Sequence, residues 1–204
     1  MEEISNMISR RANKWDDSIL LKWKDAKDIK QDHILIVGQT LNDETVKGFG
    51  FGNHFTKLTQ IVDKLKDYPL IIKLHPSMST NSMKRAQAFI NKWTSLGHQV
   101  FTGYESIHSI LPYTKCAIID NSTAGIECMM HDVPIISYGY PDYHWVTQDL
   151  RILTELRGYI DDLMIKDNLC LGIYLITFVM IYQLLLKDLK IFYNNYGCKN
   201  FQYK

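Results

Sequence analysis

The sequence predicts an α/β fold: a Rossmann-like parallel sheet of about five strands with helices on both faces. Two observations support this prediction. Short runs rich in β-branched residues alternate with longer amphipathic segments, the order from which parallel sheets are built. Unusual polar residues follow several of these runs, where the expected strands end. The chain has no internal repeat and no low-complexity linker.

The expected elements follow one another in simple alternation. The strands are expected at residues 33–37, 69–74, 99–101, 117–119 and 133–136. The helices are expected at residues 54–66, 79–93 and 105–111, directly after residue 123, and from about residue 147 to 163. This order divides the chain into a helical lead-in (1–30), an α/β domain (31–165) and a hydrophobic, helical C-terminal tail (166–204).

Composition, charge and cysteine spacing are those of an ordinary globular protein and give no sign of nucleic acid or metal binding. Of the 204 residues, 46% are hydrophobic and 22% are charged, as in an ordinary globular protein. A formal net charge of +1, without a basic cluster interleaved with aromatic residues, gives no reason to expect nucleic acid. The four cysteines have neither CxxC spacing nor a histidine at zinc-site spacing, which favours a reducing compartment and no metal.

Residues 116–139 form the stretch around which the chain is organised. They read as strand, tight loop, helix and strand, and Ser122 or Thr123 can cap the helix. A helix start is a frequent site for phosphate. Gly125 allows a ligand close to the backbone, and Glu127 can accept hydrogen bonds from a ribose. The alternative, a capped helix with nothing bound, fits this segment equally well.

Convergence strengthens the prediction of a binding site. In open parallel sheets, ligands bind beyond the carboxyl ends of the strands. Four expected strands deliver unusual polar or aromatic residues to that edge: Gln39 and Asp43, Lys73 and His75, Asn121 with Ser122 and Thr123, and the aromatic loop at residues 138–145.

Four of these segments together resemble the capsule polysaccharide biosynthesis family, which includes bacterial transferases of 3-deoxy-D-manno-octulosonic acid (Kdo) that use CMP-Kdo. The resemblance spans roughly residues 33–163. It rests on residues 39–43, 72–76 and 122–127, and on residues 139–143 with Trp145 and Thr147. Members are similar to GT-B glycosyltransferases, with two Rossmann-like halves around a cleft. The matched motifs belong to the C-terminal half, which binds the nucleotide sugar.

The resemblance implies a role for each matched residue. Asp43 would be the catalytic nucleophile or base. His75 would contact the donor phosphate and take part in catalysis, helped by Lys73. Ser122 and Thr123 would hold the same phosphate.

Gln39, Asn121 and Gly125 would complete the donor site, and Glu127 would reach the cytidine ribose. No cofactor or metal is expected, since the CMP-sugar is the substrate and no carboxylate cluster is available for a cation.

The chain departs from the family pattern at both ends. Residues 1–30 are too few for the second half that supplies the acceptor site, so a partner chain or an upstream domain is expected to bind the glycan or glycolipid acceptor. The alternative is a non-catalytic nucleotide-sugar-binding subunit. A flavodoxin-like or response-regulator-like module is disfavoured, because Asp32 lies before the first strand rather than after it.

Residues 169–186 are an uncharged run at the lower length limit for crossing a bilayer. Gly172, Thr177 and Gln183 favour a buried or interfacial helix, with a membrane anchor as the alternative. The N-terminus has no signal peptide, so we expect a cytoplasmic protein that this run can bring to the inner face of the membrane.

Overall fold

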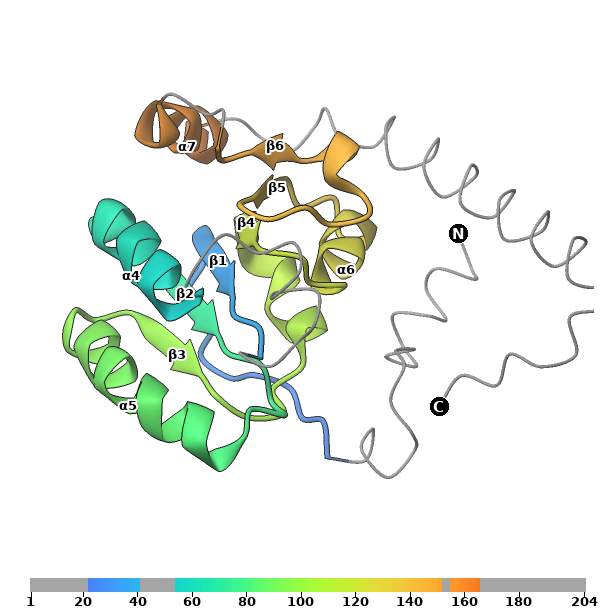
Figure 1. Cartoon of the computed structure of the whole chain (residues 1–204). Coiled ribbons are helices and arrows are strands. Elements are labelled where there is room, and N and C mark those ends of the chain that lie inside the picture. The colour runs from blue at the N-terminus through green and yellow to red at the C-terminus, as the bar shows by residue number, and fades with distance from the viewer. Residues whose placement is uncertain (1–21, 41–53, 152–154, 166–204) are drawn as a thin grey trace, which may run out of the picture. The chain divides into compact units, whose positions relative to one another are not determined.

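The computed structural model describes residues 22–40, 54–151 and 155–165 (Figure 1). All of these residues lie within the first of two compact units, Met1–Asn168 and Leu169–Lys204. The strands are β1 (His33–Val37), β2 (Leu70–Lys73), β3 (Gln99–Phe101), β4 (Thr114–Ile119), β5 (Ile135–Ser137) and β6 (Gln148–Asp149). The helices are α4 (His54–Leu65), α5 (Thr80–Ser95), α6 (Ala124–Met130) and α7 (Leu156–Ile165), with 3₁₀ turns η1 (Ile107–Ser109), η2 (Leu111–Tyr113) and η3 (His144–Val146).

The six strands form one sheet in the order β3-β2-β1-β4-β5-β6, and every pairing is parallel. This order confirms the predicted Rossmann-like fold. The chain runs outward from β1 in one direction and from β4 in the other, so β1 and β4 flank the topological switch point. Ligands of such sheets bind in the crevice outside this point.

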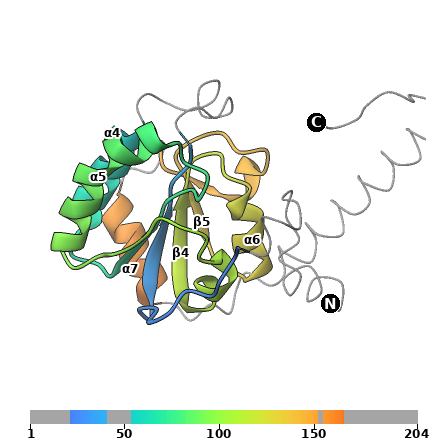
Figure 2. The ribbon, with the colours of Figure 1, turned by 90° about the horizontal axis from the view of Figure 1, so that it is seen from below.

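Helices cover both faces of the sheet because its central strands are apolar throughout. On one face, α4, α5 and α7 pack over Ile34 and Ile36 of β1 and over alternate residues of β2 and β4 (Figure 2). The other face carries α6 (Figure 2). All five residues of β1 are buried, which explains why its sequence does not alternate between polar and apolar residues.

Two predicted helices are wrong in detail. Residues 147–151 do not begin a helix: they carry β6, which pairs with β5 through Ile136 and Ser137, and α7 begins only at Leu156. The predicted helix at 105–111 is replaced by the 3₁₀ turns η1 and η2. The sheet therefore has six strands rather than about five.

The lead-in and tail lie largely outside the described residues. Residues 22–30 contain no helix, and Lys24 forms a parallel bridge with Glu105. The expected helices of residues 1–21 and the apolar run at 169–186 are outside the described part of the chain. Within that part, the structure contains no helix of the length and apolar character that crossing a membrane requires.

Candidate functional site

The residues that follow the strands at their carboxyl ends lie together at one edge of the sheet, called here the carboxyl edge. It comprises Gln39 after β1, His75 after β2, residues 120–123 after β4, residues 138–140 after β5, and Arg151 after β6. Among the predicted site residues, Asp43 lies outside the described residues. The others are in the described part, and most of them line this edge.

Gln39 and Asn121 meet across the switch point. Gln39 is buried, and its Oε1 accepts a hydrogen bond of 2.9 Å from the backbone N–H of Asn121. The backbone N–H of Gln39 donates to Nε2 of His54 at 2.9 Å. The Gln39 side chain thus joins the ends of β1 and β4 where a ligand of this fold would sit.

A buried histidine and carboxylate, missed in the sequence, support this junction. His54 Nδ1 lies 3.4 Å from Asp120 Oδ2, and both side chains are almost fully buried. Because Nε2 accepts the Gln39 N–H, the proton of the neutral ring is on Nδ1, facing Asp120 and the Tyr138 hydroxyl at 3.5 Å. Burial raises the pKa of Tyr138 well above its ordinary value, and the charge of Asp120 adds to this.

Gly139 lies directly against the same carboxylate. A Cβ at this position would overlap Oδ1 of both Asp120 and Asn121. The end of β5 therefore approaches the end of β4 at a distance that only glycine permits.

Lys73 is buried beneath the edge. Its Nζ donates to the carbonyl of Gly103 at 2.8 Å and lies 5.8 Å from the ring centroid of Trp23. Burial lowers the pKa of Lys73 to about 8, against the opposing charges of Glu105 and Glu127. The lysine thus places a positive charge below the site and ties β2 to the segment after β3.

His75 is partly exposed at the end of β2. Its Nδ1 accepts a hydrogen bond of 3.1 Å from the backbone N–H of Ser77. The neutral ring therefore carries its proton on Nε2, which makes that nitrogen a hydrogen-bond donor.

Ser122 and Thr123 precede the seven-residue helix α6. Ser122 Oγ accepts from the backbone N–H of Ala124 at 3.2 Å, so the serine caps the turn as predicted, while Thr123 makes no such bond. The close approach at Gly125 is made by Tyr143, whose hydroxyl would overlap a Cβ there and donates to the Ser122 carbonyl. The lack of a side chain at Gly125 therefore leaves room for Tyr143 of the aromatic loop.

Glu127 of α6 belongs to a chain of titratable groups that includes His108 of η1 and His131 after α6. Its Oε1 lies 3.7 Å from Nε2 of His108, and His108 Nδ1 lies 3.1 Å from Nε2 of His131. Burial raises the pKa of Glu127 to about 7, and Lys73 opposes the shift. Among the described residues, no three His, Cys, Asp or Glu side chains are grouped as metal ligands.

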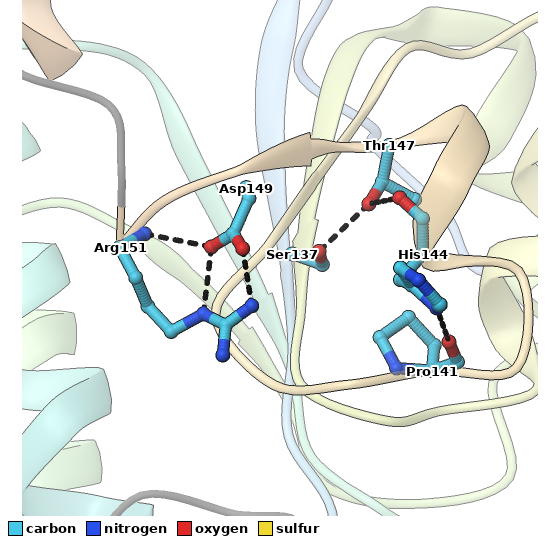
Figure 3. A network of polar contacts seen from close by, with 6 residues as sticks. All are labelled: Ser137, Pro141, His144, Thr147, Asp149 and Arg151. Atoms are coloured by element: carbon cyan, nitrogen blue, oxygen red, sulfur yellow. Dashed lines mark hydrogen bonds and ion pairs between the residues drawn. The ribbon is translucent and has the colours of Figure 1, made fainter.

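The aromatic loop after β5 is held by its own polar contacts (Figure 3). Ser137 Oγ lies 2.7 Å from Thr147 Oγ1, and His144 Nδ1 donates to the Pro141 carbonyl at 3.1 Å. In the same loop, Tyr140 and Trp145 are exposed at 46% and 58% of their surfaces. The loop adds an aromatic surface beside the carboxyl edge.

Comparison with known proteins decides the family. The family model described as "Capsule polysaccharide biosynthesis protein" matches residues 1–153, three quarters of the chain. The chain belongs to this family. No curated protein matches the sequence.

Two solved structures resemble this member of the capsule polysaccharide biosynthesis family. One is Thermosulfurimonas dismutans KpsC, beta Kdo 2,4 transferase, at 13% identity and a TM-score of 0.51, covering 73% of this chain and 47% of that one. The other is Thermosulfurimonas dismutans KpsC, beta Kdo 2,7 transferase, at 18% identity and a TM-score of 0.45, covering 72% and 50%. The first likeness supports the α/β fold. The match spans about half the length of each solved chain.

Proposed function

We propose that this chain is the donor-binding half of a glycosyltransferase, which binds a CMP-activated sugar such as CMP-Kdo and serves transfer to a glycan or glycolipid acceptor. The observation that carries the proposal is the polar junction at the switch point, where Gln39 joins Asn121 over the buried pair His54 and Asp120. Nucleotide ligands of this fold occupy that position. Family membership and the likeness to a Kdo transferase support this class of sugar.

The donor phosphate is the leaving group in this proposal. His75 Nε2–H donates to a phosphate oxygen, because Ser77 holds the other ring nitrogen as an acceptor. Ser122 and Thr123 approach the same group from the end of β4, on the other side of β1. Lys73 acts from below through its charge, since its Nζ is bonded to the Gly103 carbonyl. Preorganised donors of this kind stabilise charge that develops on the leaving group.

The chemical step exchanges one glycosidic bond for another. The bond between the anomeric carbon and the phosphate oxygen breaks, and CMP leaves with the bonding electrons. The acceptor oxygen forms the new bond to that carbon, and its proton passes to Asp43 where Asp43 is the base, or to the released CMP phosphate where Asp43 is the nucleophile. Asp43 is the proposed nucleophile or base, and Glu127 is the proposed partner of the ribose. The proposal needs no metal or organic cofactor.

Binding of CMP tests the proposal directly. Calorimetric titration of the purified chain with CMP, UMP and GMP is expected to give binding with CMP. The substitution His75→Ala should weaken it by about 1.5–3 kcal/mol, the scale of a hydrogen bond to a charged group. His98→Gln is the matched control, since His98 precedes β3 at the opposite edge of the sheet. Unchanged affinity for CMP in the His75 variant would remove the phosphate role.

A second candidate is a nucleotide-sugar-binding subunit that has no activity of its own. The polar junction at the switch point would serve such a subunit equally, since binding a nucleotide sugar does not require transfer. Transfer assays with CMP-Kdo separate the two candidates when an acceptor-binding domain is supplied as a partner or fused upstream. In the transferase, Asp43→Ala abolishes transfer while CMP binding persists, whereas the subunit shows no transfer with any partner.

The proposal includes a cytoplasmic location. A glycolipid acceptor would lie at the membrane, and the apolar run at residues 169–186 is the proposed peripheral contact. That run lies outside the described residues.

A further inference from the structure

Tyr138 and Tyr140, which follow β5 and are separated by Gly139, each have a cation over the ring. Nζ of Lys57, in the first turn of α4, lies 5.9 Å from the ring centroid of Tyr138. Cζ of Arg151, which follows β6, lies 3.6 Å from the ring centroid of Tyr140. Tyr138 is buried, whereas 46% of Tyr140 is exposed. A ring face attracts a cation and fixes its position.

Asp149 holds the Arg151 side chain in a defined orientation. Nε of Arg151 donates to Oδ1 of Asp149 at 2.7 Å, Nη2 donates to Oδ2, and the backbone N–H of Arg151 donates to Oδ1 at 2.9 Å (Figure 3). A guanidinium held by two hydrogen bonds and an aromatic face loses little freedom when it binds a ligand. Arg151 is therefore preorganised at the carboxyl edge.

Lys57 and Arg151 are close enough to affect each other. Burial lowers the pKa of Lys57; Asp120 opposes this shift, and the positive charge of Arg151 adds to it. Two cations near one ligand-binding edge repel each other, and an anion between them removes that repulsion. Asp120 also contacts His54, and Asp149 also accepts a hydrogen bond from the backbone N–H of Arg151. Both carboxylates therefore have structural contacts besides those with the two cations.

We propose that Lys57 and Arg151 bind the carboxylate of an acidic sugar, whose ring lies against the exposed face of Tyr140. The inference rests on the proposed function, in which His75 and Ser122 hold the phosphate on the β2 and β4 side. Lys57 and Arg151 lie toward β5 and β6, where the sugar of a nucleotide sugar would extend. The carboxylate belongs either to the donor sugar or to an acidic unit of the acceptor.

Ligands that contain successively more of the nucleotide sugar test this assignment. The intact chain and the variants Arg151→Gln and Lys57→Gln are titrated with cytidine, CMP and CMP-Kdo, and separately with the methyl glycoside of Kdo. Each substitution should weaken CMP-Kdo binding by about 10-fold to 100-fold and leave cytidine and CMP binding unchanged, if the donor supplies the carboxylate. If the acceptor supplies it, the loss appears with the methyl glycoside and CMP-Kdo affinity is unchanged.

Arg157→Gln is the matched control. Arg157 repeats the arrangement elsewhere on the surface, with Cζ 5.2 Å from the Tyr68 ring centroid and Nη2 3.1 Å from Oδ2 of Asp67. Its replacement should change none of the four affinities. An equal loss with the Arg157 variant would show a general effect of surface charge and overturn the inference.

The remaining outcomes separate this inference from the proposed function. A loss that already appears with CMP assigns the two cations to the phosphate and overturns the carboxylate site. Equal affinities in all variants overturn it as well. If the chain does not bind CMP, the proposed function fails, while a loss of glycoside binding in Arg151→Gln still supports the carboxylate site. If neither CMP nor the glycoside binds, both fail.

Discussion

Gly139 separates Tyr138 from Tyr140, and its hydrogen faces a buried carboxylate. In Gly139→Ala, the new methyl group would overlap Oδ1 of Asp120 and of Asn121, so the end of β4 must shift. We expect a loss of about 1–3 kcal/mol in the free energy of unfolding, the usual cost of overpacking, measured by urea denaturation. Gly158→Ala in α7 is the control, because its methyl group meets only the flexible Glu155 side chain. Equal stabilities of the two variants would contradict the close approach.

Glu127 gives the protein a stability that depends on pH. Its carboxyl group has an ordinary pKa of 4.5 in the unfolded chain and a pKa raised by burial to about 7 in the folded chain. Between these values the folded state binds more protons than the unfolded state, so stability falls as the pH rises through this window. In Glu127→Gln this contribution is absent.

The difference in unfolding free energy between wild type and Glu127→Gln is therefore expected to fall between pH 4.5 and pH 7, by about 1–3 kcal/mol in total. Urea denaturation of both proteins at several pH values measures it. Parallel curves for the two proteins would contradict the raised pKa.

Contacts between residues close in sequence could be predicted, whereas contacts between distant residues could not. Ser122 could be predicted as a cap because its contact, the N–H of Ala124, is two residues away. The pairing of His54 with Asp120 could not be predicted, since the two are far apart in sequence and meet only when α4 docks on β4. Lys73 was expected near the phosphate, yet the segment after β3 supplies a carbonyl that binds its Nζ.

At the scale of elements, α4 and α5 are joined by stacked aromatic rings. Phe55 of α4 stacks on Phe89 of α5 with centroids 5.5 Å apart, and Phe89 stacks on Trp93 at 5.9 Å. Trp93 is fully buried, and its Nε1 has no hydrogen-bond partner among the described residues. The side chain therefore stabilises the helix pair through packing.

Trp93→Ala should cost about 3–5 kcal/mol of unfolding free energy, because it leaves a large cavity. Trp93→Phe should cost about 1–2 kcal/mol, since no hydrogen bond is lost and much of the volume stays filled. Denaturation followed by circular dichroism measures both. The control is Trp145→Ala on the exposed loop, expected within about 0.5 kcal/mol of wild type. A phenylalanine variant as unstable as the alanine variant would show that the indole N–H has a partner.

Element types were predictable where the hydrophobic pattern is long. The amphipathic residues of α5 have a clear helical period, and β1 is a continuous apolar run rich in β-branched residues. β6 has only two residues, too few for any period, and depends on tertiary pairing with Ile136 and Ser137 of β5. Because of this pairing, the segment after the aromatic loop is extended, and α7 begins only at Leu156.

At the scale of the whole molecule, we propose that the described domain supplies the donor-binding face of a site. A GT-B transferase needs a second domain, because the acceptor must reach the anomeric carbon from the side that the donor domain leaves open, and water must be excluded there. We therefore predict that the described domain binds the donor and that efficient transfer also requires an acceptor-binding domain.

The central claim is that a cytidine nucleotide binds at the carboxyl edge, over the switch point between β1 and β4. The most direct measurement is a titration of the isotope-labelled chain with CMP, followed by shifts of the backbone amide resonances. We expect shifts concentrated at Gln39, His75 and residues 121–124, with no comparable shifts at His98, which precedes β3 at the opposite edge. Shifts confined to that opposite edge or to α5, or no shifts at millimolar CMP, would contradict it.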